Sequence, residues 1–197
     1  MLYLYDQAIL EDLLESFSNN IHPTIKCVSS EEIVNLAAQL NNDHIEYPLI
    51  CIIRAPNTPI DNNLLNFTRT HFGVCTVMDK QTNILYYEQV IPVQLEYALT
   101  VLTPNISARD ELIRELLFKY STQYFLSIRC PYESNRLIRF GIRVDTSKDI
   151  EYSSGIIEYL EQGKLYQTII PLICDGAVLL NYRPVKLKRN SLETSVS

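Results

Sequence analysis

The chain has 197 residues, of which 47% are hydrophobic and 20% charged, and a net charge of −6. This length and composition are typical of a single globular domain that is long enough to bury a sizeable core without disulfide or metal staples. We expect one domain over residues 1–189 and a flexible tail over residues 190–197. The charge is uneven: residues 1–98 hold 4 Lys/Arg and 12 Asp/Glu, whereas residues 99–197 hold 13 and 11. Such a distribution favours head-to-tail association, although charges spread over solvated faces give the same count.

The cysteines argue against a disulfide framework and against a zinc site. There are five, an odd number, and their wide spacing contains no CxxC pair: Cys27, Cys51, Cys75, Cys130 and Cys174. Their use suits a reducing compartment. Residues 1–20 lack the basic start of a signal peptide, and no apolar run is long enough to span a bilayer. We therefore expect a protein that is made in the cytoplasm and lies outside membranes.

The first half of the chain predicts a helix, a short strand, a second helix and a buried strand. Apolar residues recur at helical spacing over Leu2–Phe17, with an expected buried stripe of Leu4, Ala8, Leu10, Leu13, Leu14 and Phe17. Thr24–Val28 is a strand candidate. A capping box at Ser29–Glu32 opens a helix that continues to Leu40. The continuous apolar run Pro48–Ile53 is typical of a strand buried on both faces.

A long hairpin follows. Its first arm is Val74–Met78, and its second begins at Ile84 and runs to about Thr103. The second arm alternates strictly, so one face is expected to be buried, with Val93, Leu95, Tyr97, Leu99 and Val101 on it. Pro92 lacks a backbone donor, and we expect it at a bulge, a bend or an edge.

The second half predicts one helix and several strands. Ser107 is the expected N-cap of a helix with the buried stripe Leu112, Ile113, Leu116, Leu117 and Tyr120. Strands are expected over residues 124–129, 136–144, 156–160, 165–174 and 177–187, with a turn at Asp175-Gly176. The sum is an α+β fold: a mostly antiparallel sheet with two or three helices packed on one face and long hairpin arms.

No pattern in the sequence indicates catalysis. His22, His44 and His71 have no Cys, Asp or Glu partner at ligand spacing, and the five glycines form no nucleotide-binding loop. Cys130 has no neighbouring base that would make it a nucleophile. We therefore expect no catalytic residue, no cofactor and no metal, and a protein that is not an enzyme.

Aromatic and basic residues on the strands indicate an interaction surface instead. The candidate interface residues are Tyr86, Tyr87, Arg139, Arg143, Lys186 and Lys188. The tyrosines, with Tyr97, lie on the long hairpin, which is expected to reach neighbouring copies. The basic residues have few interleaved aromatics, so protein contact is favoured over nucleic-acid binding.

Two segments resemble small structural proteins of tailed bacteriophages. The strand Val93–Thr103 and the acidic helix Asp110–Phe118 are similar to the strand and helix of neck and tail terminator, or tail-completion, proteins. The resemblance covers roughly residues 45–180 and rests on packing patterns. It implies a virion protein without catalytic residues that forms a homo-oligomeric ring, commonly a hexamer, on other phage tail or neck proteins. In such a ring nucleic acid would be met only as a channel lining. The chain departs from the family in the long strand group after the helix.

An alternative from another class stays open: a cytoplasmic dimeric ligand-binding or regulatory α+β domain. An enzyme whose active site is not visible in the sequence is a third and weaker alternative. The mass of the protein in solution separates the first two.

Overall fold

A computed structural model describes residues 2–17, 23–28, 47–57, 73–79, 85–129, 136–154 and 165–179, with the backbone alone at residues 73–79, 85–89, 136, 154 and 179. The described elements are α1 (Tyr3–Ser16), β1 (Thr24–Cys27), β2 (Leu49–Arg54), β3 (Gly73–Asp79), β4 (Leu85–Thr103), α4 (Ile106–Tyr120), β5 (Tyr124–Arg129), β6 (Arg136–Val144), β7 (Glu151–Ser154) and β8 (Tyr166–Leu179). The expected α+β fold is confirmed. The expected helix after Ser29 and the strand at residues 156–160 lie outside the described residues, as does the chain beyond residue 179.

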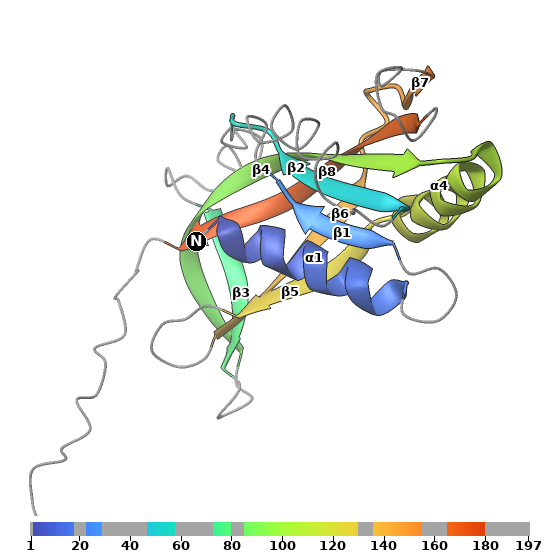
Figure 1. Ribbon diagram of the computed structural model, residues 1–197. Coiled ribbons are helices and arrows are strands. Elements are labelled where there is room, and N and C mark those ends of the chain that lie inside the picture. Colours follow the sequence, from blue (N-terminus) through green and yellow to red (C-terminus); the bar gives the residue numbers. More distant parts are fainter. Residues whose placement is uncertain are drawn as a thin grey trace, which may run out of the picture.

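The described strands form one curled sheet of eight strands (Figure 1). Its order is β1-β2-β4-β3-β6-β8-β7, with β5 paired to β6 and an additional pairing of β4 with β8. Only β1 and β2 run parallel; the other described pairs are antiparallel. Helix α1 lies alongside the two edge strands β1 and β5, and α4 lies at one end of the sheet (Figure 1). Both helices contribute to one hydrophobic core on the inner face.

The long strand β4 is the centre of that core. It pairs with β8 from Val90 opposite Leu179 to Thr103 opposite Tyr166. The expected alternation is confirmed, because all five predicted inward residues of β4 are buried. Strand β2 is buried on both faces as predicted, with Ile50 and Ile52 in the main core and Leu49, Cys51 and Ile53 in a second cluster behind it.

Helix α1 buries Leu13 and Phe17 as expected, but its buried stripe otherwise differs from the expected one. Tyr5, Ile9 and Leu13 are buried at a spacing of four, whereas Leu14 is 50% exposed. The Tyr5 hydroxyl accepts a hydrogen bond from the Ala177 N–H and donates one to the Ala177 carbonyl, each at 2.8 Å. This pairing decides the rotation of α1, because a buried backbone amide and carbonyl need partners.

Helix α4 starts earlier than predicted. Its N-cap is Asn105, with extended backbone and a side chain that accepts a hydrogen bond from Ala108 N at 2.7 Å. Ser107 is therefore inside the helix, and Asp110 and Glu111 lie beyond its first turn. Asn and Ser are about equal as N-caps, so the sequence did not distinguish them. The buried stripe is confirmed, with Leu117 only half-buried.

The turn expected at Asp175-Gly176 is wrong. Strand β8 passes through it without interruption from Tyr166 to Leu179. A Cβ at Gly176 would lie 3.1 Å from the Val93 side chain and 3.2 Å from that of Leu95. Glycine is therefore used here for the close approach of β8 to β4, and not for a turn.

Pro92 lies at a local edge, as expected. On one side it faces Ala177 of β8, whose N–H and carbonyl bond to Tyr5. The pair is thus not hydrogen-bonded, and the proline nitrogen points away from β8. On the side of β4 opposite β8, no described strand pairs with the residues between Val90 and Glu96. Val90 is the last residue of β4 that pairs with β3, and the Glu96 carbonyl accepts a hydrogen bond from Ala55 N. The missing donor leaves no acceptor unsatisfied there.

Candidate functional site

The outer face of β5, β6 and β8 carries the two predicted interface arginines that can be located. Inward residues of β6 are Ile138, Phe140 and Ile142, so Arg139 and Arg143 point outward. The register places Arg139 opposite Ser127 of β5 and Arg143 opposite Ile173 of β8. We call this outward surface of β5 and β6 the outer sheet face.

The two arginines have different partners. The Arg139 guanidinium lies 4.3 Å from the centre of the Phe125 ring, which is 48% exposed. Arg143 forms an ion pair with Asp175 at 3.2 Å, and Gln123 donates to the same carboxylate at 3.2 Å. Arg143 is therefore neutralised within the chain, whereas Arg139 has an aromatic partner and no carboxylate among the described residues.

A glycine leaves room for this network. A Cβ at Gly141 would come within 2.3 Å of the Gln123 side-chain nitrogen. Gln123 crosses β6 over that position to reach Asp175, so a larger residue would displace it. The sequence predicted the strand that holds Arg139 and Arg143, but not Phe125, Gln123 or Asp175 as their neighbours. For Phe125, the period-two spacing with Ser127 and Arg129 is a signal that could have found it.

The other predicted interface residues are not brought to this face. Tyr86 and Tyr87 pair through their backbone with Val77 and Thr76 of β3, and their side chains lie outside the described part. Lys186 and Lys188 also lie outside it. Tyr97, expected on a reaching arm, is only 3% exposed and donates to Asp6 Oδ1 at 2.8 Å. This part of the hairpin expectation is wrong, because β4 is long in order to cross the core.

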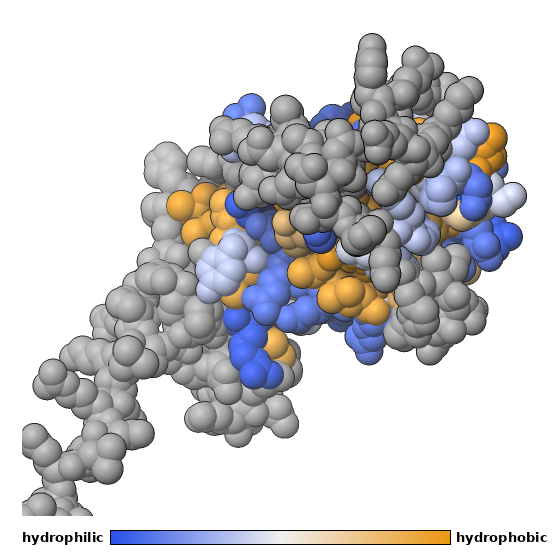
Figure 2. Space-filling model, in the orientation of Figure 1, coloured by the Kyte–Doolittle hydropathy of each residue, from blue (hydrophilic) through white to orange (hydrophobic). Residues whose placement is uncertain are grey.

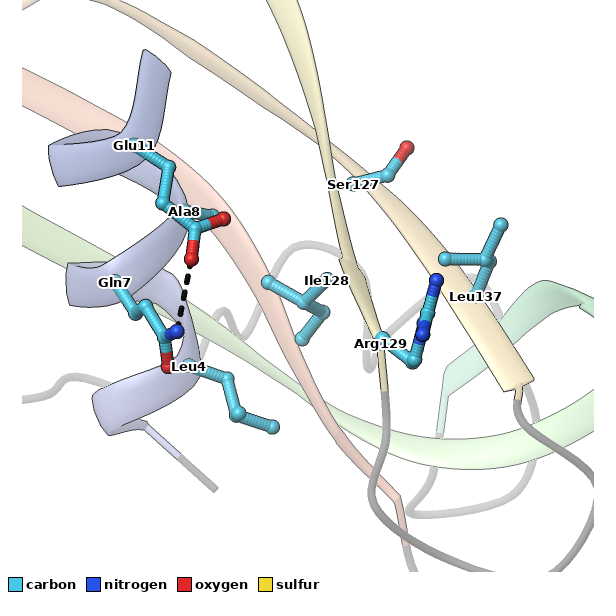
Figure 3. A pocket seen from close by; sticks show the side chains of 8 residues that line it. All are labelled: Leu4, Gln7, Ala8, Glu11, Ser127, Ile128, Arg129 and Leu137. Carbon is cyan, nitrogen blue, oxygen red and sulfur yellow. Dashed lines mark hydrogen bonds between the residues drawn. The ribbon is translucent and has the colours of Figure 1, made fainter. Parts of the chain in front are cut away.

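A groove adjoins the outer sheet face between α1 and β5 (Figure 3). Its volume is about 550 Å³. The helix wall carries Leu4, Gln7, Ala8 and Glu11, and the strand wall carries Ser127, Ile128, Arg129 and, from β6, Leu137. Ile128 points toward the helix, and Arg129 lies beside its register partner Leu137 (Figure 3). The groove thus has mixed walls, in which apolar and polar residues are equally represented, with Glu11 on one side and Arg129 on the other.

Two carboxylates of α1 bond the helix to the sheet and to α4. Asp12 forms an ion pair with Lys119 at 2.7 Å and accepts hydrogen bonds from Tyr120 and Tyr124 at 2.9 and 3.2 Å. Asp6 accepts both bonds from Arg54, at 2.8 and 3.0 Å. Charge-assisted bonds at both ends of α1 fix its position against the sheet.

Burial and these carboxylates change the acidity of the phenols. Burial, and then Asp12, raises the pKa of Tyr120 far above its ordinary value of 10.0. Burial and Asp6 do the same to the pKa of Tyr97. Both hydroxyls therefore stay protonated and act as donors at neutral pH.

The thiols with described surroundings are poor nucleophiles. Burial raises the pKa of Cys51 to about 11 and also raises the pKa of Cys174. Burial and Asp6 raise the pKa of Cys27. All three are protonated at neutral pH, and the thiolate is the reactive form. The three histidines and Cys130 lie outside the described residues.

Within the described ranges, no three potential metal-ligating residues come together. None of the described helices is both long and apolar enough to cross a membrane. On the side of the molecule that carries α1, hydrophobic residues form small patches between hydrophilic ones (Figure 2).

A scan of the sequence against protein-family models and a search of curated proteins find no match.

Proposed function

We propose that this protein is a non-enzymatic structural subunit of a virion, which forms a ring at the neck or tail end of a phage in the manner of a tail terminator. The observation that carries the proposal is the outer sheet face, where Arg139 and Arg129 present guanidinium groups without a carboxylate partner in the described chain. Exposed arginine next to an exposed aromatic ring is typical of protein interfaces. Carboxylates of a neighbouring copy supply the opposite charge.

The fold supports this role through its rigidity. One curled sheet with a continuous core, an ion pair from the sheet to α1 and another from α1 to α4 presents its outer surfaces in fixed positions. A ring subunit must hold its two contact surfaces at a constant angle, since a small error prevents closure. Other phage tail or neck proteins would then bind the faces of the closed ring.

A second candidate function draws on the groove between α1 and β5. Its volume of about 550 Å³ lies within the range of small-molecule sites. This favours the dimeric ligand-binding or regulatory domain. Such a protein would grow no larger than a dimer as its concentration rises, whereas the ring subunit would form one larger particle.

The test is the assembly of a charge-reversal variant. Arg139→Glu should shift the purified protein from the oligomer toward the monomer in size-exclusion chromatography with light scattering, with little change in thermal unfolding. Arg139 is the better choice than Arg143, because Glu at residue 143 would face Asp175 and disturb the protomer itself. The matched control is Arg114→Glu on α4, which is also exposed and has no ion-pair partner in the described chain.

Two outcomes would contradict the role of the outer sheet face as a protein contact. If Arg139→Glu and Arg114→Glu both assemble as well as the unmodified protein, the outer sheet face is not the contact surface. If instead the protein binds DNA tightly, with an affinity that falls steeply with salt and is lost in Arg139→Glu, the face contacts nucleic acid. In a ring, that second result would assign it to the channel lining.

A further inference from the structure

Strand β5 has a free edge, and the register shows which backbone groups point out from it. Asp145 N donates to Pro171 O at 2.9 Å, which makes the odd-numbered residues of β8 those that bond toward β6. Counting across the ladders, the even residues of β6 bond to even residues of β5. The N–H and carbonyl groups of Phe125, Ser127 and Arg129 therefore point away from β6. No described strand pairs with them.

The groove lies along this edge. Ser127 and Arg129 form its strand wall, and α1 stands on the far side. A free strand edge beside a helix, with a cavity between them, accepts an extended peptide backbone: the backbone bonds to the edge, and alternate side chains enter the cavity. The chemistry of the groove therefore points to a strand as its occupant.

Strand β7 has the complementary edge. It pairs only with β8 among the described strands, and the same counting leaves the backbone groups of Tyr152 and Ser154 pointing outward. Beside this edge lie the exposed carboxylates of Glu151 and Asp149, neither with an ion-pair partner in the described chain. One edge is thus basic and the other acidic, and they belong to different strands of the sheet (Figure 1).

We infer that β7 of one copy adds to the free edge of β5 in the next copy and fills the groove between β5 and α1. This rests on the proposed ring and names its contact. A parallel pairing keeps the outer faces of the two sheets continuous, because Ser127 then bonds to even residues of β7 while lying opposite an odd one. Glu151 then lies on the side of Arg129, and Tyr152 enters the groove beside Ile128. Tyr152 is 58% exposed. The Arg109 guanidinium lies 5.5 Å from the centre of the Tyr152 ring and 5.7 Å from that of the Tyr166 ring. If Tyr152 enters the groove of the next copy, Arg109 still has the Tyr166 ring as its partner.

Charge selects this pairing over its rivals. Two β5 edges, or two β7 edges, would bring side chains of like charge to one interface, Arg129 in the first case and Glu151 in the second, without an opposite charge to pair with. Pairing β5 with β7 joins opposite charges. Because the two edges differ, the contact is heterologous, and repeated copies close into a ring when the rotation allows it.

The first test removes one outward backbone donor. Ser127→Pro deletes an N–H that β6 does not use, whereas Ser127→Ala keeps it. We expect both variants to fold, and Ser127→Pro to weaken assembly at least about tenfold relative to Ser127→Ala, as measured by light scattering over a concentration series. Hydrogen exchange should show the Ser127 and Arg129 amides fast in the protomer and protected in the assembled protein.

The second test exchanges the charges. Arg129→Glu and Glu151→Arg should each weaken assembly, and the variant that carries both should recover it. Failure to recover would assign the β5 edge to another segment and overturn the pairing. Equal assembly of Ser127→Pro and Ser127→Ala, or unchanged exchange at Ser127 on assembly, would overturn the inference while leaving the ring in place. An unmodified protein that never assembles would overturn the ring itself.

Discussion

At the scale of single residues, polar side chains of α1 and α4 determine how the helices sit on the sheet. Tyr5 satisfies both backbone groups of Ala177 where β6 no longer accompanies β8. The Asp12 carboxylate pairs with the Lys119 ammonium group of α4 and accepts hydrogen bonds from the phenols of Tyr120 and Tyr124. Burial of apolar side chains supplies most of the stability of such a core. The hydrogen bonds and ion pairs determine which rotation of each helix is adopted, among several that would bury apolar residues.

Tyr5→Phe tests the bridge to Ala177. Loss of the hydroxyl leaves a buried amide and carbonyl without that partner, so the free energy of unfolding should fall by about 1–3 kcal/mol. Urea denaturation measures it. The matched control is Tyr3→Phe on the same helix, which is 56% exposed and should change stability by less than about 0.5 kcal/mol. Equal effects at the two positions would contradict the role given to Tyr5.

Tyr120 makes the free energy of unfolding depend on pH in the alkaline range. Its folded pKa is raised above the ordinary value of 10.0, so the folded state keeps a proton that the unfolded chain loses above that pH. Stability is therefore full below about pH 10 and falls as the pH rises further. Tyr120→Phe should flatten this fall when unfolding is measured between pH 9 and 11. An identical slope in both proteins would show that the phenol ionises freely in the folded state.

At the scale of elements, the predictable parts were those with a strong period. The alternation of β4 and the apolar run of β2 identified strands and their buried faces from sequence. The failures have local physical reasons. Asn105 and Ser107 are equally good N-caps, so the start of α4 could not be predicted. The glycine of Asp175-Gly176 is typical of a turn, but here it allows β8 to approach Val93 closely. α1 has apolar residues on several sides, so its buried stripe depended on the partner of Tyr5.

Leu99→Ala and Leu116→Ala test the contact between β4 and α4. Both leucines are at most 1% exposed and belong to one core, so each truncation should cost about 2–5 kcal/mol of stability. Chemical denaturation measures this. Phe118→Ala is the control, since that ring is 86% exposed on the same helix and should change stability by less than about 0.5 kcal/mol. Changes that small at both leucines would mean that the core is centred elsewhere.

At the scale of the whole molecule, the sequence predicted the fold class but only part of the candidate site. Arg139 and Arg143 were found because they alternate with apolar residues on one strand. The groove could not be found, since it is made by α1 and β5, which are more than a hundred residues apart in the chain. The basic edge of β5 and the acidic edge of β7 likewise emerge only when the register of the sheet is known.

The mass of the particle that the purified protein forms in solution tests the central claim most directly. Native mass spectrometry resolves the number of copies of the 22.7 kDa chain. A ring built by a heterologous contact between copies predicts one discrete closed particle of more than two copies, formed as the concentration rises to hundreds of micromolar. A strict monomer, or a dimer that does not grow at any concentration, would contradict it.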